Sequence, residues 1–219
     1  MKTMNCTTIA LVLLLAAGTS QAVWIGATSG TTDNDLHEYT NTNNWENGVI
    51  DDVLPNTFTG ATTLFFKKDH ATGPSGLTLN YQGYTITFQN SGGTRTLSLN
   101  GDFTFNGNDT SVILAYIKID LGGEARVFAN TANSLFRWYG DIFNGRITKE
   151  GTGRFAVYGT KNFDGPLNVN AGNFYTQQAT LLNYTGPTYI NDASMGLYLD
   201  GSAPYTSPII VSALTGSRT

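Results

Sequence analysis

Lys149 and Glu150 are the first residues to consider for chemistry, because they stand side by side in the glycine-rich stretch ITKEGTGRFAVYG, residues 147–159. A lysine and a glutamate could act as general acid and base if both reached one substrate atom. Adjacent residues of a β-strand, however, point to opposite faces of the sheet. If this stretch forms strands, the two side chains cannot share a substrate, and we do not expect a catalytic pair.

Three aspartates form a second candidate. Asp120, Asp141 and Asp164 recur at roughly one coil spacing, and carboxylates at equal phase on successive coils of a β-helix could hold Ca²⁺ beside a proton-abstracting base. Aspartate also favours tight turns, and both Asp141 and Asp164 have a glycine neighbour. We favour the turn interpretation and expect no enzymatic activity, with catalysis kept as the alternative.

Metal ligands are sparse. One acidic cluster near the N-terminus could supply a Ca²⁺ ion with oxygen ligands, but it lacks the glycine and the distal glutamate of an EF-hand loop. His37 and His70 do not have the spacing of a zinc site, and we expect both to be exposed and uninvolved. We expect no cofactor, with a structural Ca²⁺ as the open alternative. The cluster consists of Asp33, Asp35, Glu38, Asp51 and Asp52.

Aromatic residues offer a different chemistry. The chain has 11 Tyr, 12 Phe and 3 Trp, and flat rings in an exposed row could stack on sugar faces. The same rings could instead alternate into the core or stack between coils. The tyrosines to consider are Tyr139, Tyr158, Tyr175, Tyr184, Tyr189 and Tyr198. Among them, Tyr158, Tyr184 and Tyr189 are the candidate glycan contacts.

Composition and the N-terminus narrow the partners. Charged residues make up 13% of the 219 residues and the net charge is −4, whereas phosphate binding needs clustered Lys and Arg. We therefore expect no nucleic-acid partner. Lys2, the short apolar run 9–18 and the small residues around Ala22 form the pattern of a cleaved secretory signal. That run is too short for a membrane span, so we expect none in the mature chain.

The single cysteine, Cys6, lies inside this signal. The mature chain would therefore have no disulfide, no cysteine-ligated metal and no thiol nucleophile. We expect three parts: a secretory signal at 1–22, a loop-rich N-terminal cap at 23–56 in which Trp24 and Trp45 anchor the loops, and a β-solenoid at 57–219. We expect the solenoid to be either a short secreted array or the front of a longer one.

Short runs with a polar and apolar period of two predict strands with one buried face at 62–66, 76–81, 84–88, 96–99 and 102–105. NFDGPLNVN, 162–170, aligns with NYTGPTYIN, 183–191, so that Asn162 matches Asn183 and Asn170 matches Asn191. A period of about 20 residues indicates a solenoid, because propeller blades need about 40. We therefore predict an all-β fold, a right-handed parallel β-helix. Its inward residues would be Leu97, Leu99, Val157, Leu167, Val169, Ile190, Leu197 and Leu199.

Residues 145–174, GRITKEGTGRFAVYGTKNFDGPLNVNAGNF, resemble the autotransporter-associated β-strand repeat of exported bacterial proteins. Pro166 and Leu167 depart from that pattern. The resemblance implies that Lys149 recurs at a solvent-facing position and that the glycines separate successive strands. The structural repeat positions are Thr148, Lys149, Gly151, Gly153, Gly159, Gly165 and Gly172, with Gly186 in the degraded second copy.

The resemblance also implies a function. It predicts a non-catalytic passenger protein, secreted or on the outer cell surface, that presents a rigid repeat surface in the manner of an adhesin. Its partners would be extracellular polysaccharide or other surface proteins. Two alternatives stay open: a carbohydrate-active β-helix enzyme of the polysaccharide lyase or hydrolase kind, and a sugar-binding module.

Overall fold

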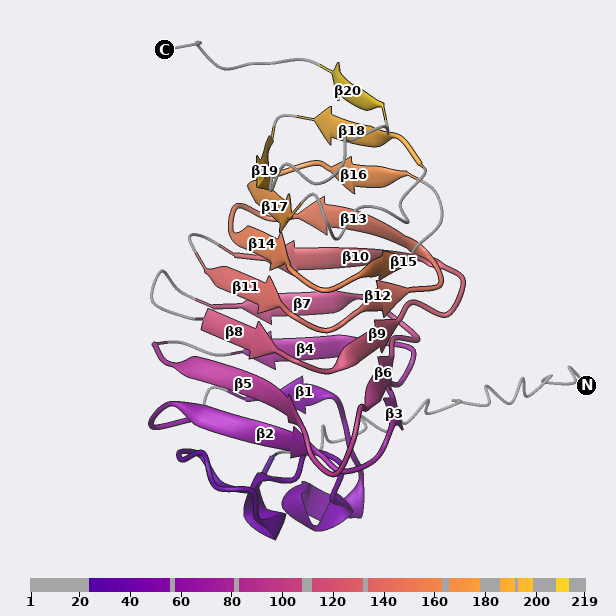
Figure 1. The fold of residues 1–219 in the computed structure, drawn as a ribbon. Helices are drawn as coiled ribbons and strands as arrows, with labels where there is room; N and C mark the ends of the chain where they lie inside the picture. Colours follow the sequence, from indigo (N-terminus) through magenta and orange to yellow (C-terminus); the bar gives the residue numbers. More distant parts are fainter. Residues whose placement is uncertain are drawn as a thin grey trace, which may run out of the picture.

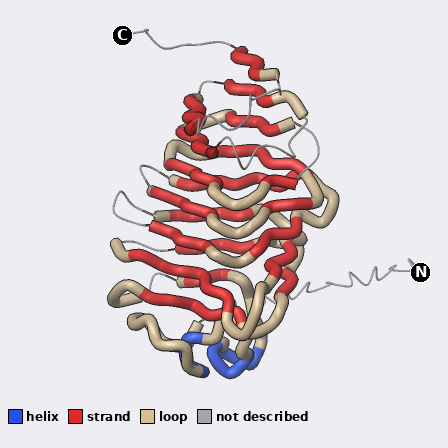
Figure 2. Tube along the Cα trace, in the orientation of Figure 1, coloured by secondary structure: helices blue, strands red, loops and turns tan. Residues whose placement is uncertain are grey.

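The computed structural model describes residues 24–55, 58–80, 83–107, 112–131, 134–162, 166–177, 186–191, 193–198 and 208–212. Within these ranges the chain forms three short 3-10 helices followed by strands in three parallel sheets (Figures 1 and 2). Every strand pair is parallel, and consecutive strands of the chain belong to different sheets. The fold is therefore an all-β parallel solenoid, as the repeat predicted.

The three sheets form the sides of the coil, and within each sheet the strands of successive coils lie side by side. In Figure 1 the chain passes along the front strands, turns at the edge and returns along the back strands while it climbs, which gives a right-handed coil. The eight-stranded sheet contains β1 (Val53–Leu54), β4 (Leu77–Asn80), β7 (Phe103–Asn106), β10 (Ala125–Asn130), β13 (Arg146–Glu150), β16 (Leu167–Val169), β18 (Thr188–Asn191) and β20 (Ile209–Ser212). The seven-stranded sheet contains β2 (Thr62–Phe66), β5 (Thr85–Asn90), β8 (Val112–Ala115), β11 (Leu135–Trp138), β14 (Arg154–Val157), β17 (Asn173–Gln177) and β19 (Ser194–Tyr198). The five-stranded sheet contains β3 (His70–Ala71), β6 (Thr96–Ser98), β9 (Lys118–Asp120), β12 (Ile142–Phe143) and β15 (Lys161–Asn162).

The coils shorten along the chain. In the N-terminal half Asn80 pairs with Asn106, 26 positions further on. In the C-terminal half Asn170 and Asn191, which are hydrogen-bonded one coil apart, are separated by 21 positions. These two asparagines are matched positions of the sequence repeat, so the repeat offset is one coil. The repeat is hard to see in the N-terminal half because the longer coils there hold extra turn residues.

The core lies inside the coil and is built from stacked like residues. Phe103 and Phe128 stack with ring centroids 5.8 Å apart, and Phe128 and Phe155 stack at 5.0 Å. This spacing follows from the separation of about 4.8 Å between neighbouring strands. Of the predicted inward residues, Leu97, Leu99, Val157, Leu167, Val169 and Ile190 are buried. Leu197 and Leu199 lie outside the side chains that the structure describes.

The five runs predicted as strands correspond to β2, β4, β5, β6 and β7, with bounds that differ only at their ends. Strand β2 differs in one respect, because all five of its residues are buried rather than alternate ones. It is the first strand of its sheet, and the N-terminal segment covers it through bridges from Gly30 to Thr62 and from Glu38 to Phe65. The cap thus pairs with the edge of β2 that has no neighbouring coil.

The cap itself consists of η1 (Asp35–His37), η2 (Thr42–Asn44) and η3 (Glu46–Gly48), shown at the lower end of Figure 1. Trp24 and Trp45 are 2% and 1% exposed, and their rings meet edge to face at 5.3 Å. The predicted anchoring by these two tryptophans is confirmed. Strand β1 already belongs to the solenoid, although it lies within the predicted cap segment. The predicted signal, 1–22, lies outside the described residues.

The glycines of the repeat serve two different purposes. Gly151 and Gly172 have φ angles of 72° and 66°, a left-handed conformation that glycine adopts without the strain other residues meet. Gly153 and Gly159 have no such angle, but a β-carbon on Gly159 would lie 1.8 Å from the carbonyl oxygen of Gly140 on the preceding coil. The prediction that glycines shape the coil is right, although at these two positions the reason is close backbone approach. Gly165 lies outside the described residues.

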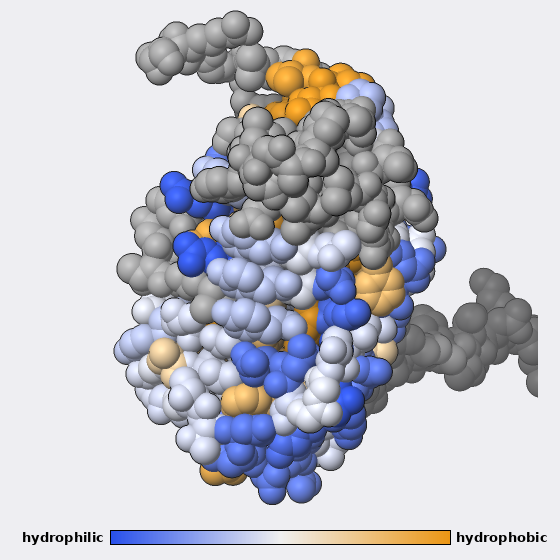
Figure 3. All heavy atoms as spheres, viewed as in Figure 1, coloured by the Kyte–Doolittle hydropathy of each residue, from blue (hydrophilic) through white to orange (hydrophobic). Residues whose placement is uncertain are grey.

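The visible surface is mostly hydrophilic, with an apolar patch at the end of the stack (Figure 3). Ile209, Ile210 and Val211 of the edge strand β20 are 41%, 42% and 49% exposed. No helix among the described residues is long and apolar enough to cross a membrane.

Candidate functional site

Lys149 does not face solvent, and this prediction is wrong. The side chain is fully buried in β13, where it occupies the inward position between Phe128 and Val169. Its ammonium donates hydrogen bonds to the carbonyls of Glu150, Gly151 and Ala171. Burial lowers the pKa of Lys149 to about 8. The lysine therefore ties the turn of its own coil to the turn of the next one, and its contacts are with backbone carbonyls.

Glu150 points the other way, as the alternation predicted, and begins a polar ladder. Asn170 Nδ2 donates to Glu150 Oε1 at 2.6 Å, and Asn191 Nδ2 donates to Asn170 Oδ1 at 2.9 Å. The two asparagines are matched positions of the sequence repeat, one coil apart. Because each amide both donates and accepts, the ladder links three coils. Lys149 and Glu150 thus both have structural partners.

The alternative of a catalytic aspartate row fails for its first two members, because Asp120 and Asp141 are not in register. Asp120 pairs with Phe143 across the five-stranded sheet, and the register that joins Ile142 to Ile119 places Asp141 opposite Lys118. Asp120 accepts hydrogen bonds from the Gly122 amide at 2.9 Å and from Asn144 Nδ2 at 2.8 Å. These are the bonds of a turn-forming aspartate, the interpretation we favoured. Asp164 lies outside the described residues.

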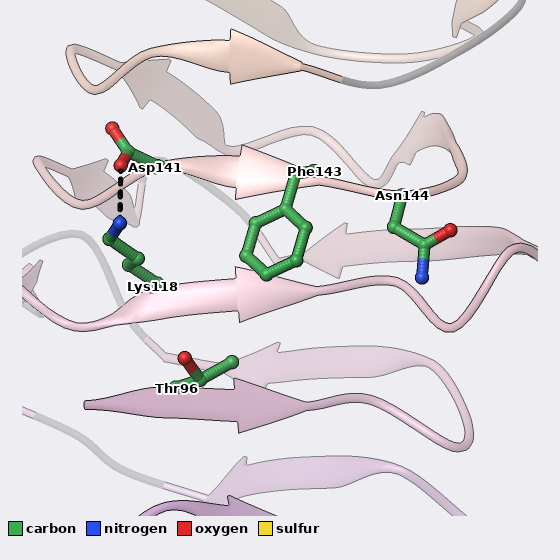
Figure 4. A pocket seen from close by; sticks show the side chains of 5 residues that line it. All are labelled: Thr96, Lys118, Asp141, Phe143 and Asn144. Carbon is green, nitrogen blue, oxygen red and sulfur yellow. Dashed lines mark ion pairs between the residues drawn. The ribbon is translucent and has the colours of Figure 1, made fainter.

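The same register assembles a hollow on the outer face of the five-stranded sheet. It has a volume of about 480 Å³ and is lined by Thr96, Lys118, Asp141, Phe143 and Asn144 (Figure 4). Lys118 Nζ lies 3.1 Å from Asp141 Oδ2, from the neighbouring coil. The Phe143 ring stands between this ion pair and the amide of Asn144. An apolar ring flanked by a carboxylate, an ammonium and an amide can offer both a stacking face and hydrogen bonds to hydroxyl groups.

The charge state of Asp141 is set by its neighbours. Partial burial works to raise its pKa, but the hydrogen bonds from Lys118 and from the Thr160 amide outweigh burial and hold the pKa below its ordinary value. Asp141 is therefore ionised at neutral pH and paired with an ammonium. A carboxylate in this state can accept hydrogen bonds but cannot serve as a general acid without losing its partner.

The predicted acidic cluster divides into two groups. Asp33, Asp35 and Glu38 surround Lys67 Nζ at 3.8, 3.3 and 3.6 Å, and the hydrogen bond with Asp35 is the main reason why the pKa of Lys67 is raised. Asp52 is buried elsewhere. Within the described ranges no group of three or more His, Cys, Asp or Glu residues is arranged to hold a metal ion.

The two histidines are not exposed and uninvolved, so that prediction is also wrong. His37 is 6% exposed and its ring nitrogens lie 2.8 Å from Asn34 Oδ1 and 3.0 Å from the Ser29 carbonyl. His70 Nε2 lies 2.5 Å from Asp52 Oδ1. The spacing of the two histidines did not reveal these contacts, because those of His37 depend on how the cap folds on itself and that of His70 on a segment 18 positions earlier.

The Tyr39 hydroxyl donates to the same Asp52 oxygen at 2.9 Å, and the Gly73 amide donates to the other oxygen at 3.0 Å. Tyr39 is fully buried, and burial followed by the charge of Asp52 raises its pKa well above the usual value. This network fastens the cap to the first coil and is closed to solvent, so we interpret it as structural.

Three tyrosines form a ladder, and each of them directly follows the last residue of a strand of the seven-stranded sheet, β8, β11 or β14. Tyr116 and Tyr139 stack with centroids 4.9 Å apart and planes 9° apart, and Tyr139 and Tyr158 stack at 4.9 Å and 14°. Rings stacked in this way cover one another's faces and leave their edges to solvent. A sugar needs an open ring face, so the ladder does not supply the coplanar row that a sugar-binding strip would require. Tyr189 is half-buried on β18, and Tyr184 lies outside the described residues.

The geometry defines the class of protein, a right-handed parallel β-solenoid with a capped N-terminal end. Comparison adds no name to this class: no family model, no curated protein and no solved structure matches the chain. The functional interpretation therefore depends on the residues themselves.

Sequence reasoning missed Lys118 and Phe143 as members of a site. Both flank an inward isoleucine, since Lys118 precedes Ile119 and Phe143 follows Ile142, and the two isoleucines pair across neighbouring coils. If the run around Ile119 is aligned with the run around Ile142, isoleucine to isoleucine, Lys118 falls beside Asp141. This alignment could have been made from the sequence.

Proposed function

We propose that the protein is an exported, non-catalytic, adhesin-like passenger that presents the rigid lateral surface of its solenoid outside the cell. The observation that carries this proposal is that charged and polar side chains of the coil make hydrogen bonds to other parts of the protein. Lys149, Asp52 and Glu150 bond to neighbouring turns and coils. Asp120 and Asp141, two of the three aspartates considered for a catalytic row, accept hydrogen bonds from the backbone amides of turns.

Rigidity follows from the same contacts. Side-chain ladders add to the backbone hydrogen bonds between coils, so each coil is held by its neighbours over its full width. A solenoid of this kind offers extended lateral faces whose shape is fixed before a partner arrives, which reduces the ordering cost of binding. The resemblance to autotransporter-associated repeats and the signal-like N-terminus support export.

Export can be tested directly by expression of the full chain in a secreting bacterial host. The expected result is a protein outside the inner membrane whose first residue is Val23, established by mass spectrometry of the intact protein. A matched variant with Leu11→Arg and Leu14→Arg should stay inside with residues 1–22 attached. Retention of the unchanged chain with its N-terminus intact would contradict the export proposal.

The hollow around Phe143 favours a second candidate function, binding or processing of a carbohydrate. Neutral oligosaccharides should bind the purified protein, and Phe143→Ala should weaken this binding. Tyr84→Ala, which removes an exposed ring outside the hollow, is the matched control. Reducing ends released over time, and lost in Asp141→Asn, would establish an enzyme instead of a binding module.

A further inference from the structure

A second, smaller hollow lies on the outer face of the seven-stranded sheet, and its floor is Ala156. Arg137 of β11 pairs with Ala156 of β14, which in turn pairs with Tyr175 of β17. Arg154 and Tyr158 stand two positions before and after Ala156 on the same side of the chain, because side chains alternate along a strand. A methyl group surrounded by four long side chains leaves a space of about 130 Å³.

The lining of this hollow has an unusual charge for the protein. The chain as a whole carries −4, yet the residues around the hollow include two arginines and no acid: Leu135, Arg137, Arg154, Ala156, Tyr158 and Tyr175. The two arginines lie diagonally across neighbouring strands, because Arg137 pairs with Ala156, two positions after Arg154. An anion placed between them would relieve their mutual repulsion.

Among the described residues, neither arginine has an anionic partner. In the described part of the chain the guanidinium groups of Arg137 and Arg154 make no ion pair or hydrogen bond, and Arg137 Nε is shielded from solvent without a hydrogen-bond partner. Three other cations differ, since Lys67 and Lys118 have carboxylate partners and Arg126 donates to two carbonyls. A buried guanidinium nitrogen without a partner costs free energy, so the hollow is complementary to a group that the described residues do not provide.

The chemistry of that group follows from the donors. Guanidinium groups bind carboxylates and other oxyanions through paired hydrogen bonds. Tyr158 and Tyr175 line the hollow beside the charges. A hollow of this size admits an acidic substituent and part of its ring, while the rest of a longer molecule would extend over the open sheet face.

We propose that the hollow over Ala156 binds the acidic groups of an extracellular polysaccharide, with uronic-acid carboxylates as the ligand. The proposal depends on the proposed function because export is what brings the protein to such a polymer. It is separate from the hollow around Phe143, which lies on a different sheet and has a carboxylate in its lining. Binding to the purified protein tests the hollow alone. If no binding were found, the result of the export experiment would be unaffected.

The test is calorimetric titration of the purified full chain with a galacturonic-acid oligosaccharide at low ionic strength and pH 7. We expect Arg137→Gln and Arg154→Gln each to weaken binding at least about tenfold, since a hydrogen bond to a charged group contributes on the order of 1.5–3 kcal/mol. Arg146→Gln, which removes an exposed arginine from the eight-stranded sheet, should change the affinity less than twofold. Thermal unfolding of each variant shows that it is folded.

A further variant separates shape from charge. Ala156→Leu keeps both arginines and fills the hollow, so it should abolish binding if the ligand enters and leave it unchanged if charge alone attracts the polymer. Equal loss in Arg146→Gln, or equal binding of a neutral dextran oligosaccharide, would overturn the proposal. Tighter binding of a heparin oligosaccharide would support the oxyanion site and identify sulfate as its source. Equally tight binding of free galacturonate would overturn the polymeric ligand.

Discussion

Lys149 Nζ lies 2.7 Å from the carbonyl oxygen of Gly151 and donates a hydrogen bond to it inside the coil. The positive φ of Gly151 turns the backbone so that this carbonyl points inward. The glycine and the lysine of the repeat therefore act together, one by shaping the turn and the other by supplying its donor. Their joint presence in the repeat has a structural explanation that needs no substrate.

The first prediction concerns the pH dependence of this lysine. Burial lowers the pKa of Lys149 from 10.5 to about 8, so between these values the unfolded chain binds more protons than the folded chain. The free energy of unfolding should therefore gain a contribution that rises with pH across this window. In Lys149→Met that contribution disappears, and the difference between wild type and variant should increase from pH 7.5 to pH 10 in urea denaturation.

The control for this experiment is Lys118→Met, because Lys118 is 40% exposed and ion-paired on the surface. Its difference from wild type should not increase over the same pH range. If the free energy of unfolding changed with pH to the same extent in wild type and in Lys149→Met, the folded protein would not disfavour the charged form of Lys149.

How much the sequence could predict is clear from the residues near Lys149. The alternation of polar and apolar residues and the matched asparagines of the repeat were sufficient for the strands and the coil, because both are local or periodic properties. The same alternation puts Lys149 on the inward side with Ile147, yet the resemblance to the repeat family predicted a solvent-facing position. Its burial depends on three carbonyl oxygens from two coils, and no local pattern records them.

The candidate sites were less predictable, since each combines residues from successive coils of unequal length. Asp120 and Asp141 are nearly one coil apart in the sequence, but the five-stranded sheet pairs Asp120 with Phe143. That difference of register moves Asp141 beside Lys118 instead of Asp120. The hollow over Ala156 likewise depends on the shorter step that pairs Arg137 with Ala156, which only the structure supplies.

A second prediction concerns the polar ladder. Asn170→Asp keeps the size of the side chain but replaces the donor to Glu150 Oε1, 2.6 Å away, with a like charge. We expect a loss of about 1–3 kcal/mol in the free energy of unfolding at pH 7, with partial recovery near pH 4 as carboxylates become protonated. Asn168→Asp, two positions earlier and within β16, changes an amide that makes a 3.5 Å contact with Thr148, and it should cost less at both pH values.

A third prediction concerns the close approach of successive coils at glycine. A β-carbon at Gly159 would overlap the backbone of Gly140, so Gly159→Ala must push two coils apart. We expect a loss of about 1–3 kcal/mol, which for a chain of this size lowers the Tm by about 2–4 °C per kcal/mol. Gly73→Ala meets open space and should leave the Tm within about 1 °C. Similar Tm values for the two variants in calorimetry would show that the coils separate without cost.

The last prediction concerns the attachment of the cap. Asp52 accepts from Tyr39 and Gly73 and contacts His70, and it is 2% exposed. Asparagine, like aspartate, tolerates the φ of 58° at this position. Its amide nitrogen, however, would point at a hydrogen-bond donor where the carboxylate oxygen accepted a bond. We expect a loss of about 2–3 kcal/mol in the free energy of unfolding, and faster amide hydrogen exchange in residues 24–55 than in the coils around β10 and β13.

Asp69→Asn, which alters an exposed acceptor for the Thr96 amide, should have a smaller effect and leave exchange in the cap unchanged. Uniform acceleration over the whole chain in Asp52→Asn would instead mean that the cap and the solenoid unfold as one unit.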